Sequence, residues 1–201
     1  MQLNRKLILF AIAPVVFAAI PGTAWLIGGR DSTRANAPAV SNLRLVAVLS
    51  ERRLKMYEAD TLVWQYPISP GMPSYPTPAG EYKIRRLVWN PRWTPPPDAE
   101  WAKKYTAKEP GNPANPMKVV KIFFKEPDYF IHGTAETYRL GEDASHGCLR
   151  MDPEHVAEVA KFIMEHGGQA REESWFWRVL HFRNEEKPII LSNPVPLTVM
   201  N

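Results

Sequence analysis

Short runs with apolar residues at every second position dominate the first half of the folded region. Such a run covers residues 43–49, and similar runs follow at 54–56, 64–68 and 81–88. Alternation of this kind is typical of strands that bury one face. Pro-Gly and Pro-Ala-Gly segments between the runs favour turns. The pattern therefore predicts a β-meander that begins near Leu43.

Two further strands are predicted to form a β-hairpin that ends at His132. Residues 119–124 and 129–132 are rich in apolar and aromatic residues, and Glu126-Pro127-Asp128 between them favours a turn. The second strand would carry His132 to its end. Near the C-terminus, 188–192 and 196–199 could add edge strands.

One segment has the period of an amphipathic helix. Asp152 is a good N-cap, Pro153 suits the first helical position, and apolar residues recur every three or four positions up to Met164. Gly167-Gly168 would end the helix. The sequence therefore predicts a mainly β domain with one principal helix, whose apolar face packs on the sheet.

Residues 90–117 interrupt this regular pattern. They contain seven prolines, which excludes long regular elements, although residues 98–105 could form a short helix. Aromatic residues at Trp89, Trp93, Trp101 and Tyr105 indicate a packed, ordered segment, because disordered loops are poor in aromatics. A loop of this length within a domain is often a lid or a binding wall.

The N-terminal residues predict export. Residues 7–27 form an uncharged, mostly apolar run preceded by Arg5 and Lys6, which suits a signal peptide or a membrane anchor. Its 21 residues nearly span a bilayer core of about 30 Å, which favours an uncleaved anchor in the inner membrane. We therefore divide the chain into an export segment at 1–28, a linker at 29–42 and one domain at 43–201.

Net charge first suggests a nucleic-acid or anionic partner, but its distribution argues against one. The formal net charge is +4, and residues 1–40 contain four of the 25 basic residues and one of the 21 acidic residues. The remaining residues therefore hold 21 basic and 20 acidic side chains. A nearly neutral domain offers no electrostatic footprint for nucleic acid.

Cys148 is the single cysteine, so it cannot form a disulfide within the chain. A lone cysteine is usually a small buried hydrophobe, but this one follows Ser145-His146-Gly147 and comes sixteen positions after His132. A thiol with a pKa of about 8.5 needs a nearby base or cation to react at neutral pH. On chemical grounds either histidine could be that base. Gly147 would let successive amides converge on an oxyanion.

These segments resemble a known family. The strings SHGCLRM and IHGT, with TPAGEY, NPRW and PVPL elsewhere, are similar to the signature of the L,D-transpeptidase catalytic domain, also called the YkuD domain. The resemblance runs from about Leu43 to His166. It implies a β-sandwich-like fold, with Cys148 as the nucleophile and His132 as the general base.

The resemblance also implies supporting roles around this pair. The carbonyl of Gly133 would orient the base, and the amides of His146, Gly147 and Cys148 would form an oxyanion hole. Arg150 could bind substrate carboxylates, although a structural ion pair is an equally good interpretation. Ser145 and Thr134 are expected to form hydrogen bonds within the loop rather than to react.

The implied activity is acyl transfer on peptidoglycan peptide stems in the periplasm, without a metal or cofactor. D-Alanine would leave from a donor stem, and the acceptor would be a second stem, giving 3–3 cross-links, or a lipoprotein. With water as the acceptor the enzyme would be a carboxypeptidase. Two rivals are a zinc site made by His132, His146, Cys148 and His155, which lacks HExxH or paired CxxC spacing, and a non-catalytic wall-binding module.

Overall fold

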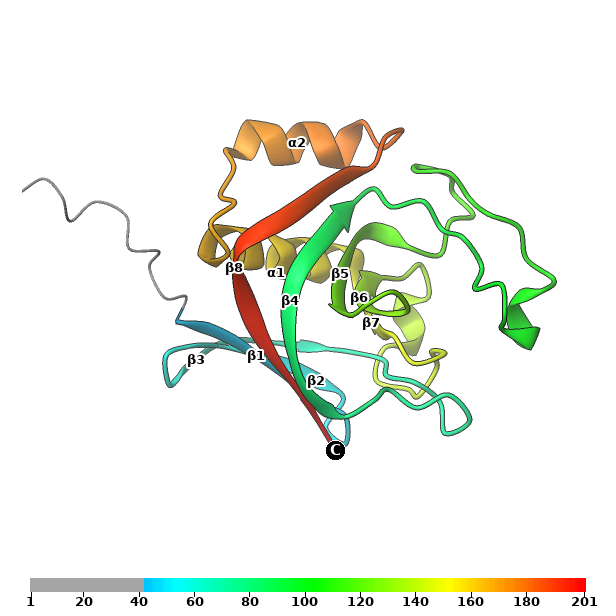
Figure 1. Cartoon of the computed structure of the whole chain (residues 1–201), viewed down its shortest axis with the longest axis horizontal. Coiled ribbons are helices and arrows are strands. Elements are labelled where there is room, and N and C mark those ends of the chain that lie inside the picture. Colours follow the sequence, from blue (N-terminus) through cyan, green and yellow to red (C-terminus); the bar gives the residue numbers. More distant parts are fainter. Residues whose placement is uncertain (1–41) are drawn as a thin grey trace, which may run out of the picture. The chain divides into compact units, whose positions relative to one another are not determined.

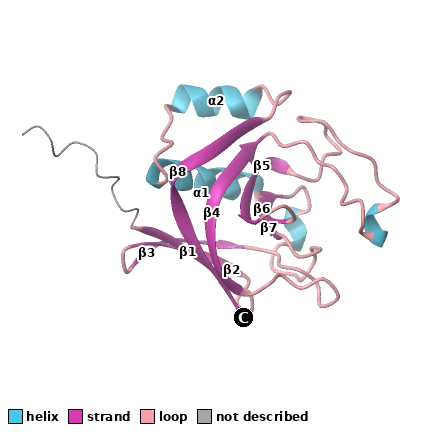
Figure 2. Cartoon of the chain, in the orientation of Figure 1, coloured by secondary structure: helices cyan, strands magenta, loops and turns pink. Residues whose placement is uncertain are grey.

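Eight strands form one mixed sheet in the computed structural model, which describes residues 42–201 (Figure 1). The spatial order is β3-β2-β1-β8-β4-β5-β6-β7. All neighbours are antiparallel except the pairs β1–β8 and β6–β7, which are parallel. Figure 2 shows that strands outweigh helices, which confirms the predicted mainly β fold.

The predicted hairpin is confirmed, and the predicted meander is confirmed for its first three strands. The fourth predicted strand, at 81–88, forms but pairs with β8 and β5 instead of with β3. The alternating runs form β1 (Leu43–Val48), β2 (Arg53–Glu58), β3 (Thr61–Pro67) and β4 (Gly80–Trp89). The segment before the histidine forms β5 (Lys118–Lys125) and β6 (Tyr129–Gly133), which pair antiparallel. The short strand β7 (Leu149–Met151), which the sequence did not predict, follows Cys148.

The prediction of two separate edge strands near the C-terminus was wrong. Residues Lys187–Met200 form one long strand, β8, which lies between β1 and β4 in the middle of the sheet. A strand that contains prolines is usually excluded from the centre of a sheet, because proline has no N–H to donate to a neighbouring strand. Here β1 pairs with β8 only from Leu197 onward, so Pro188, Pro194 and Pro196 lie where one side of the strand has no neighbour.

The predicted helix is confirmed as α1 (Pro153–His166), and the Asp152 side chain accepts a hydrogen bond from the Glu154 amide at 2.8 Å. The helix contacts β5, β6 and β8, and Figure 1 shows it crossing behind β4. Its buried face joins the sheet residues in one core. The members from the helix are Val156, Ala157, Val159, Ala160, Ile163 and Met164.

A second helix, α2 (Glu173–His181), was not predicted. Its Phe176 and Val179 are buried, and Trp175 and Phe176 pack against the ring of Trp89 with centroids 6.1 and 5.6 Å away. The helix has only nine residues, too few for a helical spacing of apolar residues to stand out among its aromatic residues.

The proline-rich segment 90–117 is largely irregular, as predicted. Its regular element is the 3₁₀ helix η2 (Glu100–Ala102), which is shorter than the helix expected at 98–105. Trp93 and Tyr105 pack edge to face with centroids 5.7 Å apart, and Trp93 exchanges backbone hydrogen bonds with Lys108. The aromatic residues therefore order the loop.

The export segment predicted at residues 7–27 lies outside the described residues, and so does nearly all of the linker. Within residues 42–201, no helix is long and apolar enough to cross a membrane. The first strand begins at Leu43, where the sequence predicts the start of the domain.

Candidate active site

Parallel pairing of β6 and β7 brings the two halves of the histidine–cysteine motif together. His132 pairs with Arg150 and Ile131 with Leu149, so Cys148 lies next to β6 immediately before β7 begins. On the other side of β7, Ser69 and Arg150 exchange two backbone hydrogen bonds of 2.9 Å. The turn that carries Cys148 is thus held from both sides.

His132 is almost fully buried, with 3% of its surface exposed. Its Nδ1 lies 2.8 Å from the carbonyl oxygen of Gly133. A carbonyl oxygen can only accept, so Nδ1 must carry the proton and donate it to this bond. Nε2 then keeps a free lone pair, which suits a base.

Cys148 is half-buried, and its thiol donates to the carbonyl oxygen of Asp128 at 3.4 Å. Burial raises the pKa of Cys148 to about 11, although the Phe130 amide, Lys121 and Arg150 each lower it. Burial also lowers the pKa of His132 to about 3. At neutral pH the resting pair is therefore a neutral thiol and a neutral imidazole.

A tight turn at residues 145–148 presents the thiol. The Ser145 hydroxyl donates to the Cys148 carbonyl at 2.5 Å and accepts from the Gly147 amide at 3.0 Å, so the predicted hydrogen bonding of Ser145 within the loop is confirmed. Gly147 has φ +105°, and a Cβ there would lie 2.8 Å from the ring of Tyr129. Only glycine fits this position without strain.

The hydrogen bonds of this turn change the expected oxyanion hole. The amide of Gly147 already donates to Ser145, so it is not free for a substrate oxygen. The amides of His146 and Cys148 donate to no acceptor within residues 42–201. If an oxyanion binds here, these two amides can hold it, rather than the three that the resemblance implied.

His146 does not contact the thiol through a hydrogen bond. Its imidazole stacks on the indole of Trp101, with centroids 3.9 Å apart, and lies 4.9 Å from the ring of Tyr75. Burial between these rings lowers the pKa of His146, and the charge of Arg150 lowers it further. The residue thus links the turn to the proline-rich loop.

Arg150 forms an ion pair with Glu136 at 2.8 Å, and the Arg150 side chain is 21% exposed. This is the structural ion pair that the sequence left open; a role in substrate binding stays a prediction. Thr134 accepts a hydrogen bond from the Glu136 amide at 3.1 Å, which confirms its expected hydrogen bonding within the loop.

Sequence reasoning missed three neighbours of the histidine and the thiol. Lys121 pairs with His132 across β5 and β6, Phe130 offers its amide to the sulfur, and Trp101 stacks on His146. The predicted hairpin alone does not point to Lys121, because a turn at residues 126–128 that pairs Lys125 with Tyr129 would place Ile122 opposite His132. A register shift between Phe123 and Lys125 brings Lys121 to that position instead. Nothing in the sequence points to the partner of Trp101.

The alternative zinc site is not assembled. Within residues 42–201, no three His, Cys, Asp or Glu side chains form a group that could hold a metal ion. His155, the fourth proposed ligand, lies on α1 and packs against Tyr66 with centroids 4.9 Å apart.

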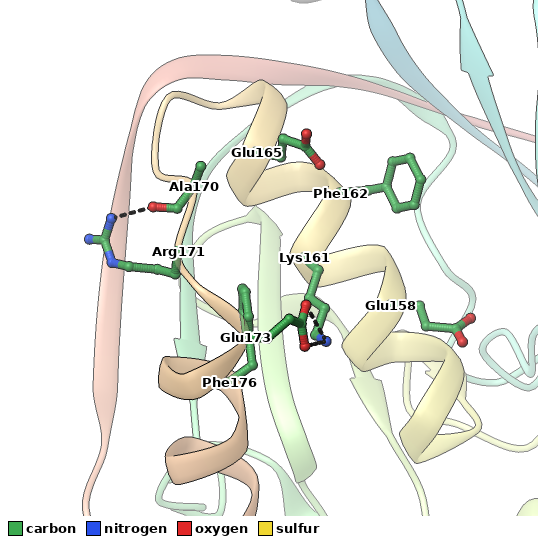
Figure 3. A pocket seen from close by; sticks show the side chains of 8 residues that line it. All are labelled: Glu158, Lys161, Phe162, Glu165, Ala170, Arg171, Glu173 and Phe176. Atoms are coloured by element: carbon green, nitrogen blue, oxygen red, sulfur yellow. Dashed lines mark hydrogen bonds and ion pairs between the residues drawn. The ribbon is translucent and has the colours of Figure 1, made fainter. Parts of the chain in front are cut away.

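A hollow of about 350 Å³ lies elsewhere, between α1 and α2 (Figure 3). Lys161 and Glu173 form an ion pair in its wall at 3.0 Å, and Phe162 and Phe176 add apolar surface. Neither His132 nor Cys148 lines this hollow. The hollow therefore lies apart from the histidine and the cysteine.

Comparison with known proteins points to one family. The family model of the L,D-transpeptidase catalytic domain, YkuD, matches residues 42–179. A putative L,D-transpeptidase YkuD of Bacillus licheniformis is 30% identical over 120 residues, which cover 60% of this chain and 59% of the relative. A probable L,D-transpeptidase ErfK/SrfK of Escherichia coli is 33% identical over 114 residues, which cover 53% of this chain and 36% of that protein.

A solved structure supports the fold. An L,D-transpeptidase from Mycobacterium smegmatis superposes with a TM-score of 0.50 at 14% identity, covering 80% of this chain and 59% of that one. The chain thus spans less than two thirds of the length of these relatives. At this identity the match concerns the arrangement of strands and helices alone.

Proposed function

The chain belongs to the L,D-transpeptidase catalytic domain family, and from this membership we propose that it is a cysteine acyltransferase acting on peptide stems of peptidoglycan. One observation carries the proposal. His132 has its Nδ1 fixed by the Gly133 carbonyl, and the half-buried thiol of Cys148 lies beside the same strand. A base with a free Nε2 next to an accessible thiol suits nucleophilic catalysis.

In the first step the sulfur of Cys148 attacks the carbonyl carbon of the third stem residue. The thiol proton passes to Nε2 of His132, and the carbonyl oxygen becomes an oxyanion that the amides of His146 and Cys148 can hold. The C–N bond then breaks, and His132 returns the proton to the leaving amine of D-alanine. A thioester on Cys148 remains.

In the second step an acceptor amine attacks the thioester, His132 takes a proton from that amine, and the thiol leaves protonated. An amine of a neighbouring stem gives a 3–3 cross-link, and an amine of a lipoprotein gives an attached protein. Water as the acceptor would make the enzyme a carboxypeptidase. Because the thiol and the imidazole are both neutral at rest, the first step requires transfer of the thiol proton to His132 and does not start from a stored thiolate.

The proline-rich loop is proposed to form one wall of the peptide site. Its Trp101 contacts His146, which lies two residues before the thiol, and this contact supports the assignment. A wall at this position would limit the access of water to the thioester.

We place this activity in the cell envelope, because peptidoglycan is assembled outside the cytoplasmic membrane. The apolar run at residues 7–27 supports export, and retention as an inner-membrane anchor is part of the proposal.

Purified protein and a tetrapeptide stem ending in D-alanine test the function. Release of D-alanine by the native protein, and its loss in Cys148→Ala with an unchanged melting temperature, is the expected result. Mass spectrometry of the products then identifies the acceptor. A native protein that binds the stem but releases no D-alanine would instead be a wall-binding module.

A further inference from the structure

Four side chains form a row across one face of the sheet beside the thiol. Val88 on β4 is paired with Lys121 on β5, Lys121 with His132 on β6, and His132 with Arg150 on β7. Directly paired residues point to the same face of a sheet. His132 therefore stands between two cations, one on each neighbouring strand.

The two cations, Lys121 and Arg150, differ in whether a carboxylate is paired with them. Arg150 is neutralised by Glu136 at 2.8 Å. Lys121 donates from Nζ to the carbonyl oxygen of Arg92 at 3.0 Å and lies 5.0 Å from the ring centroid of Phe130. Among the side chains of residues 42–201, no carboxylate forms an ion pair with it.

The surroundings of Lys121 make an ammonium without an ion-pair partner unfavourable in free energy. Burial lowers the pKa of Lys121, while the charge of Glu186 raises it. Glu186 is near enough to act on Lys121 but forms no ion pair with it, and its carboxylate accepts a hydrogen bond from the Arg92 amide at 2.6 Å. A half-buried ammonium without a paired carboxylate is poorly solvated, so an arriving anion would gain a strong partner.

We propose that Lys121 binds the free C-terminal carboxylate of the residue that leaves from the acyl donor. This inference rests on the proposed function, in which His132 protonates the leaving amine. The acyl group bonds to sulfur at the β7 side of β6, so the leaving residue extends from His132 toward β5. Neighbouring strands are about 4.8 Å apart. The amine and the carboxylate of the leaving residue, together with the lysine side chain, can span this distance.

The assignment makes Lys121 a residue that determines donor length. A stem with one more residue places its carboxylate roughly 3.5 Å further along the chain, beyond the ammonium. A donor whose terminal carboxylate is converted to an amide presents no charge at all. Both donors should react poorly for the same reason.

Two tetrapeptide donors test the proposal, one with a free terminal D-alanine carboxylate and one with the corresponding amide. For the native protein, release of the terminal residue from the acid should exceed release from the amide by about 10- to 100-fold in kcat/KM, the range for a hydrogen bond to a charged group. Lys121→Met should slow the acid to the rate of the amide, and Lys121→Arg should keep most of the preference.

Lys83→Met is the matched control, because Lys83 is an exposed lysine on β4. This variant should keep the native preference. A native protein that releases both leaving groups equally, or a Lys121→Met protein that still discriminates, overturns the inference but leaves the proposed function intact. A native protein that releases neither group overturns the proposed function itself. The comparison of acid and amide on the native protein needs no variant, so equal rates overturn the inference even if Lys121→Met fails to fold.

Discussion

The indole of Trp101 lies against the imidazole of His146, with ring centroids 3.9 Å apart and ring planes inclined by 15°. Trp101 belongs to η2 in the proline-rich loop, and His146 lies in the turn that presents Cys148. The long loop is therefore attached to the candidate site at a specific point.

Trp101→Ala should release the loop from this turn. A stacked aromatic pair contributes roughly 0.5–1.5 kcal/mol beyond its buried area, so a modest loss of stability is expected together with faster amide exchange in residues 94–108. Hydrogen–deuterium exchange measures the second effect. Trp101→Phe keeps a ring and should stay close to the native protein. Unchanged exchange in the alanine variant would show that other contacts fix the loop.

The reactivity of Cys148 should depend steeply on pH. Since burial raises the pKa of the thiol to about 11, the thiolate fraction, and with it the rate of alkylation by iodoacetamide, should rise about tenfold per pH unit between pH 7 and 9. The pKa of His132 is about 3, so His132 stays neutral and adds no inflection between pH 5 and 8. A plateau beginning below pH 7 would instead reveal a thiolate–imidazolium pair.

Replacing the two histidines should have unequal effects on turnover. His132→Ala removes the proposed base and should lower D-alanine release by roughly 10²- to 10⁴-fold, the usual contribution of general base catalysis. His146→Ala removes a stacked ring and should cost less than about tenfold by the same measure. Rates are to be compared at saturating donor, with melting temperatures confirming the fold. Equal losses would contradict the choice of His132.

Gly147→Ala should both strain and distort the turn. The new Cβ would lie 2.8 Å from the Tyr129 ring at φ +105°, so a loss of about 1–3 kcal/mol of stability and a loss of activity are expected. Gly141→Ala is the control, because Gly141 has φ +96° but no atom within 4 Å of a Cβ. It isolates the backbone strain from the steric clash. Activity in Gly147→Ala equal to that in Gly141→Ala would show that the contact with Tyr129 is unimportant.

The sequence predicted the local structure well where one face of an element is buried. The meander, the hairpin and α1 all follow from apolar spacing and from turn or capping residues. It could not predict that β8 is central, because strand order depends on partners far away in the chain. The nine residues of α2 were too few for their period to stand out among the aromatics.

Some features of the candidate site could likewise be predicted from the sequence and others could not. His132, Gly133 and the turn from Ser145 to Cys148 are consecutive or carry a recognisable motif, so the sequence could name them. Their protonation could not be predicted, because burial sets it. Lys121 and Trp101 reach the site through strand pairing and loop packing, which leave no motif.

The position of β8 also bears on how the chain acquires its fold. Strands β1–β3 form one side of the sheet and β4–β7 the other, and β8 is the strand that joins them. Because pairing with β1 begins only at Leu197, the two sides of the sheet cannot join until the last residues of β8 have been synthesised. The sheet should therefore gain its cooperative stability only after β8 has been added, because neither side can pair with the other before then.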